Sequence, residues 1–246
     1  MKKHLLLIGF LALTAACNIG VPAPESQATA TATLQPTLVP ATTAPTFTPA
    51  PTDTPIPPRF FTDEFDTTSP SWQFLQTGGL GTSQTVFENG VLRIDIPVAD
   101  TWYVGVNNTY SYTNVVVRAK VSANAAGSIG LICRYEESTG WFEFNVDNEG
   151  NYSLLLGQWL APGIAKYIPV IADVNKNIPS GNVNAEIGLS CQDNIISLFI
   201  NNNLIRRLDV TNYGLTEGNI GIAAAAYKDA PMSAIFEWVK VSEDEQ

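Results

Sequence analysis

The sequence predicts an all-β domain, an antiparallel β-sandwich or jelly roll preceded by a disordered tether. Three observations predict this class: short apolar runs alternate with a period of two, turn residues separate them, and no long window has a helical period. Gly, Asn, Thr and Val are abundant after residue 58, and Lys is scarce there. That composition suits strands and tight turns better than helices.

Each expected strand is a short apolar run between polar turn residues. In 91–96, Leu92, Ile94 and Ile96 share one face, and the preceding Asn89-Gly90 favours a hairpin because both residues tolerate positive φ. The Asn-rich turn at 201–203 predicts a second hairpin. In chain order we expect strands at 72–76, 91–96, 102–106, 115–121, 128–135, 141–147, 152–156, 183–191, 195–200, 204–210, 219–227 and 234–241.

The charge distribution excludes one class of partner. The net charge is −10, and from residue 59 onward the chain holds 11 basic and 21 acidic residues, so the folded part carries the whole excess. Nucleic-acid binding requires a basic surface, so DNA and RNA are excluded as partners. Contact with anionic lipid is disfavoured for the same reason.

The N-terminus predicts export. Lys2 and Lys3 precede an apolar run at 5–16 that is too short to span a bilayer, and the run ends in Ala-Ala-Cys17. This ending resembles the bacterial lipobox, although Thr14 stands where a Leu is usual. We expect residues 1–17 to be a lipoprotein signal with lipidation at Cys17, and the protein to be extracytoplasmic, anchored to the membrane, at the cell surface. The alternative is an ordinary signal peptide that is cleaved and released.

Residues 18–58 form the expected tether. The segment is rich in Pro and Thr, has two charged residues and shows no apolar period, so it cannot bury enough surface to fold. As polyproline II, at about 3.1 Å per residue, it would reach on the order of 120 Å. The β-sandwich domain is therefore expected at 59–246.

Two cysteines lie in the expected domain. Cys133 and Cys191 are each in phase with the apolar residues of their strands, so both should point into the core. Disulfides persist in exported proteins, which favours a bridge between them. Two buried free thiols are the alternative.

Several core and turn segments together resemble a known family. They are 130–135, 140–144, 149–152, 194–204, 218–222 and 236–239. In these segments the chain resembles the concanavalin A-like lectin and glucanase jelly rolls, notably laminin-G-like and 3-keto-disaccharide hydrolase type domains. The resemblance implies the jelly-roll fold. Many such domains bind glycans, some are hydrolases and others have no known activity, so the resemblance does not select a function.

The residues give little support for catalysis. The single histidine, His4, lies in the signal, which excludes histidine-based triads and histidine-ligated metals from the domain. Glu143, Asn145 and Asp147 resemble the Glu-x-Asp-x-Glu strand of laminarinase-type glycosidases, but Asn145 replaces Asp and Asp147 is shorter than Glu. The sequence therefore predicts that the protein is not an enzyme, with glycoside processing as a lesser alternative.

The same strand is the candidate ligand site. Alternation places Trp141 on one face with the polar residues of 143–147, and an aromatic face beside planar polar groups suits sugar binding. The candidate ligand-binding residues are Trp141, Glu143, Asn145, Asp147, Arg134, Tyr103, Tyr152 and Trp159. The alternative is an outward polar face that binds nothing. A glycan binder should present Trp141 exposed on a concave sheet.

Acidic residues at the start of the domain raise a second expectation. Asp63, Glu64 and Asp66 cluster there, and carboxylate oxygens suit calcium. The alternative is a solvated acidic cluster, and no other cofactor is expected.

Three functional classes follow from these observations. The preferred class is a carbohydrate-binding module with a glycan or surface polysaccharide as its partner. The others are a structural or protein-recognition module and a glycoside-processing enzyme.

Overall fold

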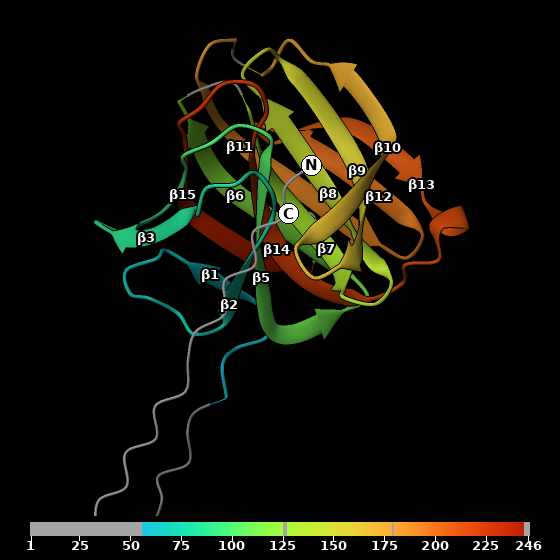
Figure 1. Ribbon diagram of the computed structural model, residues 1–246. Coiled ribbons are helices and arrows are strands. Elements are labelled where there is room, and N and C mark those ends of the chain that lie inside the picture. The colour runs from blue at the N-terminus through green and yellow to red at the C-terminus, as the bar shows by residue number, and fades with distance from the viewer. Residues whose placement is uncertain (1–55, 125–126, 179, 244–246) are drawn as a thin grey trace, which may run out of the picture. The chain divides into compact units, whose positions relative to one another are not determined.

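Strands make up nearly all of the structure (Figure 1). The computed structural model describes residues 56–124, 127–178 and 180–243, which lie within one compact unit, Thr54–Gln246. Its elements are β1 (Phe61–Asp63), β2 (Trp72–Gly78), β3 (Gln84–Glu88), β4 (Val91–Ile96), β5 (Thr101–Tyr112), β6 (Val115–Ala123), β7 (Gly127–Glu136), β8 (Gly140–Asp147), β9 (Asn151–Ala161), β10 (Ile164–Val174), β11 (Val183–Gln192), β12 (Ile195–Ile200), β13 (Asn203–Asp209), the short 3₁₀ helix η1 (Thr211–Tyr213), β14 (Gly218–Ala226) and β15 (Met232–Ser242).

The strands form two antiparallel sheets. The eight-stranded sheet has the order β13-β12-β11-β6-β15-β4-β3, with β1 paired to β15, and the seven-stranded sheet has the order β10-β9-β8-β7-β14-β5-β2. In the middle of each sheet non-consecutive strands lie side by side, such as β11-β6-β15-β4 and β7-β14-β5-β2, as in a jelly roll. The predicted fold class is confirmed.

All twelve expected strands are present, and three others were missed. The missed strands are β1, β3 and β10. β10 carries Pro169 near its middle, and a proline without an N–H argues against a strand in sequence reasoning. The structure accommodates it because β10 is an edge strand that pairs on one side, with β9.

The core between the sheets is apolar and cross-linked. It includes Leu92, Ile94, Phe142 and Phe144, all with no exposed surface. The predicted disulfide is confirmed: Cys133 on β7 is bonded to Cys191 on β11, which joins the two sheets across 58 positions of sequence. A closed loop of that length stabilises the fold by roughly 4 kcal/mol in the chain-entropy model.

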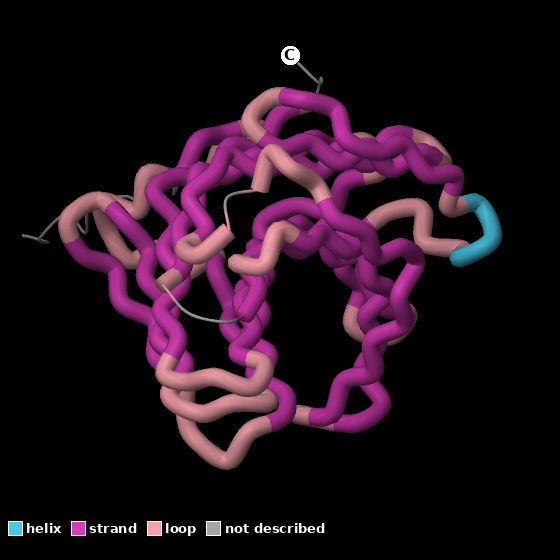
Figure 2. Tube along the Cα trace, turned by 90° about the horizontal axis from the view of Figure 1, so that it is seen from above, coloured by secondary structure: helices cyan, strands magenta, loops and turns pink. Residues whose placement is uncertain are grey.

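The seven-stranded sheet curves until its two edges meet. The Ala165 N–H of β10 donates to Thr77 Oγ1 of β2 at 3.0 Å. Figure 2 shows the strongly curved strands from above, with the short helix at the margin of the domain. The face of this sheet that points away from the other sheet, here called the covered face, is therefore roofed by its own edge strands.

The signal peptide, Cys17 and residues 18–55 of the tether lie outside the described residues. The last residues of the tether contact the domain, because the Tyr110 hydroxyl donates to the Pro57 carbonyl at 2.6 Å. At the start of the domain, the Arg59 guanidinium lies 4.8 Å from the ring centroid of Tyr112. Within the described ranges no helix has the length and apolar character needed to cross a membrane.

Candidate functional site

The predicted ligand strand has the predicted alternation but not the predicted exposure. On β8, Phe142 and Phe144 face the inter-sheet core, while Trp141, Glu143 and Asn145 lie on the covered face. Trp141 is 0 % exposed, Glu143 1 % and Asn145 3 %. The expectation of an exposed Trp141 is wrong, because β10, which the sequence did not reveal, helps to roof this face.

Local packing fixes the Trp141 indole. Its partner on β9 is Gly157, where a Cβ would lie 2.2 Å from the indole ring. The ring centroid lies 5.3 Å from that of Trp159 and 5.8 Å from that of Tyr167 on β10. Because Gly157 has no side chain, the indole packs directly against β9, and the neighbouring aromatic rings hold it there.

Glu143 is a buried acid on the covered face of β8, between Trp141 and Asn145. It accepts hydrogen bonds from Trp141 Nε1 and from Asn145 Nδ2, both at 2.9 Å. Burial raises the pKa of the Glu143 carboxyl above its ordinary value, and the two hydrogen bonds oppose that shift. The Asn145 Oδ1 atom and the Tyr167 hydroxyl have no hydrogen-bond partner although both are buried.

A cavity of about 260 Å³ lies at the end of β8 that carries Asp147. Asn145 and Asp147 both line it, so the structure brings these two predicted residues together. This cavity is here called the polar cavity, and its lining consists of Ser128, Asn145, Val146, Asp147, Asn151, Tyr152, Ser153, Ala172 and Tyr227. An aromatic ring among hydroxyl, amide and carboxylate groups suits a small polyhydroxyl ligand.

Two groups of the polar cavity also hold the local fold. Asp147 Oδ1 accepts the backbone N–H groups of Glu149 and Asn151 at 2.9 Å, which fixes the turn between β8 and β9. The Tyr227 phenol hydrogen-bonds with Ser128, and burial raises the pKa of Tyr227 to about 12. The walls of this cavity are thus set by the strands and their turn.

The opposite end of the covered face has a cavity lined by apolar side chains such as Leu75 and Leu160 together with Gln76 and Glu137. Trp159, which is half-buried and donates to the Tyr135 hydroxyl at 2.9 Å, also lines this cavity of about 300 Å³. An adjoining cavity of about 720 Å³ is lined by Trp102 and Tyr167, among others. Leu80, Leu160 and Ile164 lie exposed around these cavities.

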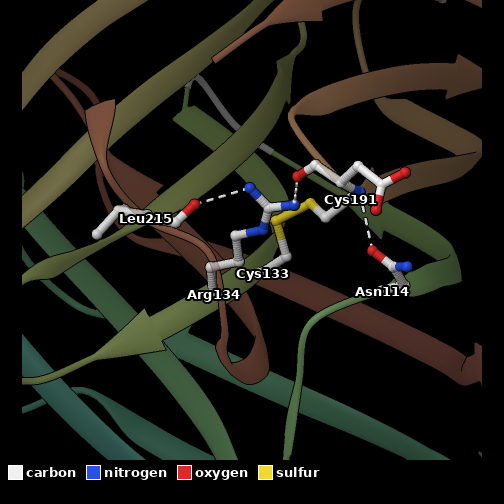
Figure 3. The surroundings of a disulfide bond; sticks show 6 residues. Asn114, Cys133, Arg134, Cys191 and Leu215 are labelled. Carbon is white, nitrogen blue, oxygen red and sulfur yellow. Dashed lines mark hydrogen bonds between the residues drawn. A yellow bond between two sulfur atoms is a disulfide. The ribbon is translucent and has the colours of Figure 1, made fainter. Parts of the chain in front are cut away.

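Three other predicted ligand residues are held in packing contacts and do not lie beside Trp141 on the covered face. Arg134 is fully buried beside the disulfide and donates to the carbonyls of Leu215, at 2.7 Å, and Asp193 (Figure 3). Tyr103 stacks on Phe74 at 5.7 Å beside the inter-sheet core. Tyr152 borders the polar cavity, but it is 4 % exposed and belongs to the inter-sheet core. These side chains serve packing, and the expectation that they face a ligand beside Trp141 is corrected.

The acidic cluster at the start of the domain has a structural role. Asp63 accepts the Phe65 N–H and the Trp72 indole N–H at 2.9 and 2.8 Å. Over the described residues, no three His, Cys, Asp or Glu side chains are grouped so that they could hold a metal ion. The calcium expectation for Asp63, Glu64 and Asp66 gains no support from this geometry.

Sequence reasoning missed four residues of the covered face: Ser128, Ser153, Tyr167 and Tyr227. Alternation within predicted strands could have found Ser128, which lies opposite Asp147 on β7, and Ser153, which lies opposite Asn145 on β9. Tyr167 could not be found that way, because its strand was not predicted.

Comparisons with known proteins give the fold. No family model matches the sequence, and no curated protein sequence matches it. A Bacillus licheniformis β-glucanase matches with a TM-score of 0.50 and 13 % identity over 75 % of this chain and 98 % of that one. A glycoside hydrolase family 16 endo-glucanase from Bacteroides ovatus matches with a TM-score of 0.51 and 10 % identity over 74 % and 99 % of the two chains.

These matches correct one expectation and confirm another. The prediction that the protein is not an enzyme is contradicted, because two solved structures that share this fold are glucanases. At identities of 10 to 13 %, these matches show the fold alone. The described domain has the concanavalin A-like jelly-roll fold.

Proposed function

We propose that this chain is a carbohydrate-binding lipoprotein whose β-sandwich takes a saccharide unit into the polar cavity. The observation that carries the proposal is the Asn145 Oδ1 atom, a buried acceptor without a partner on a residue that lines this cavity. A buried unpaired acceptor costs about 1–3 kcal/mol, and a ligand hydroxyl would remove that cost. The fold that this chain shares with two glucanases supports the same class of ligand.

The test is a glycan array followed by titration calorimetry with the full-length chain. Wild type should bind at least one oligosaccharide, and Tyr227→Ala should weaken that binding about 10-fold because it removes the aromatic wall of the cavity. Tyr213→Ala is the matched control: this exposed tyrosine lies on η1 and lines no part of the cavity. Equal losses in the two variants, or no binding by wild type, would refute the proposal.

Anchoring at the membrane is part of the proposal. A diacylglycerol on Cys17 would hold the domain outside the cytoplasm, and the Pro-rich tether would let it reach surface polysaccharide. Cys17→Ser should release the protein into the medium. Retention of the variant at the membrane would contradict lipid anchoring without affecting glycan binding.

Glycoside hydrolysis is a second candidate, and the raised pKa of Glu143 favours it. A glycosidase needs a carboxyl that stays protonated as general acid and a second carboxylate nearby. Glu143 and Asp147 lie on the same face of β8, two strand repeats apart. The test is release of reducing ends from mixed-linkage β-glucan, with loss of activity in Glu143→Gln. Absence of release by wild type would exclude this candidate for that glycan.

A further inference from the structure

The polar cavity offers two hydrogen-bond acceptors, Asn145 Oδ1 and the Asp147 carboxylate, beside amide groups that already donate within the lining. Asn145 Nδ2 donates to Glu143 Oε1 at 2.9 Å, and Asn151 Nδ2 donates to Asp147 Oδ2 at 2.8 Å. Asn145 Oδ1 is left without a partner, and the Asp147 carboxylate can only accept. A ligand group that contacts both Asn145 Oδ1 and the Asp147 carboxylate must therefore be a hydrogen-bond donor.

The charge of the cavity has one sign. Asp147 is the charged side chain in its lining, and no Lys, Arg or His belongs to that lining. Such an environment favours a cationic group and opposes a carboxylate, sulfate or phosphate.

We infer that the polar cavity selects glycans that carry a free primary amino group, such as glucosamine units. An ammonium group has three donors and no acceptor, so it complements Asn145 Oδ1 and the Asp147 carboxylate at once. An N-acetyl group would remove the charge and leave one N–H with added bulk. This inference rests on the proposed function, because it names the class of saccharide that the same cavity takes.

Titration calorimetry on the full-length chain tests the inference with three tetrasaccharides of equal length: β-1,4-linked glucosamine, its fully N-acetylated form and cellotetraose. At low salt and mildly acidic pH, the glucosamine tetramer should bind at least about 10-fold more tightly than the other two. The preference should shrink as salt is added, because Asp147 is partly exposed. The salt titration needs no variant, so it is informative whatever the variants do.

Asp147→Asn should abolish the preference for the amine. The Asn side chain keeps an oxygen for the turn N–H groups, and thermal melting will show whether the variant folds. Asp209→Asn is the matched control, because Asp209 also accepts the N–H two residues ahead, from Thr211, but lies at the end of β13 in the other sheet. It should keep the wild-type preference.

The outcomes separate the two proposals. Equal affinity for the three tetrasaccharides would overturn the amine inference and leave the carbohydrate-binding proposal standing. An amine preference that survives both Asp147→Asn and high salt would also overturn the inference. Binding of none of the three, together with a blank glycan array, would overturn both.

Discussion

The two faces of the seven-stranded sheet are both buried, but by different means. The inner face packs against the other sheet and is lined by apolar side chains such as Phe142 and Phe144. The covered face is roofed by β10, one of the sheet's own edges, and holds Glu143, Asn145 and Tyr167. A face that is buried by the edge of its own curved sheet can therefore keep polar side chains, whereas a face packed against a second sheet is apolar. Polar groups kept in this way can bind a ligand.

The two ends of the covered face differ as well. The end at Asp147 is the polar cavity, with an unpaired buried acceptor on Asn145, whereas the end at Trp159 has exposed Leu160 and Ile164 around it. The ligand proposals place recognition at the polar end. Because their packing differs, substitutions on the two faces should change the free energy of unfolding by different amounts.

The largest effect is expected on the inner face. Phe144→Ala should lower the free energy of unfolding by about 3–5 kcal/mol, because it empties a fully buried site between two sheets. Chemical denaturation measures this loss. Leu80→Ala, which trims a fully exposed side chain, should stay within about 0.5 kcal/mol of wild type. A small loss for Phe144→Ala would contradict a tightly packed inter-sheet core.

On the covered face, Gly157→Ala should cost about 1–3 kcal/mol, because the new Cβ would lie 2.2 Å from the Trp141 indole. The comparison is sharpened by a double-mutant cycle. In a Trp141→Leu background the Gly157→Ala penalty should shrink, since the ring that it strikes is gone. An unchanged penalty would show that the indole does not lie against β9.

How far the sequence predicts this molecule depends on which contacts are local. Alternation within one strand is local, and it correctly gave the strand positions, the phase of β8 and the inward direction of Cys133 and Cys191. The burial of Trp141 depends on a strand more than twenty residues away that rolls over it. Pro169 hid that strand, because proline argues against a ladder position unless the strand lies at an edge.

The candidate site follows the same rule. Asn145 and Asp147 were found because they share a face with Trp141 in one strand. Ser128 lies on β7 and Tyr227 directly follows β14, and only the sheet order brings them into one cavity with Asn145. Periodicity shows which way a side chain points, but the order of the strands decides what it meets.

The pH dependence of stability tests the buried acid of the covered face. Because burial raises the folded-state pKa of Glu143 above its ordinary 4.5, the native state holds this proton more tightly than the unfolded chain. Its contribution to stability is therefore complete below pH 4.5 and is lost as pH rises through the raised folded-state pKa. Glu143→Gln should remove that decline in unfolding free energy, measured by denaturation from pH 4 upward.

The matched control for this decline is Glu149→Gln, which removes an exposed carboxylate and keeps Glu143. It should retain the wild-type decline with rising pH. The same decline in Glu143→Gln would mean that another group produces it.

The smallest effect on stability separates two hydroxyl groups of the covered face. The Tyr167 hydroxyl has no partner, whereas the Tyr135 hydroxyl accepts the Trp159 N–H at 2.9 Å. Tyr167→Phe should therefore be neutral or raise the free energy of unfolding by up to about 1 kcal/mol, while Tyr135→Phe should lower it by about 1 kcal/mol. If both substitutions destabilise equally, the Tyr167 hydroxyl has a hydrogen-bond partner in solution. The covered face then has one fewer unpaired polar group with which to bind a ligand.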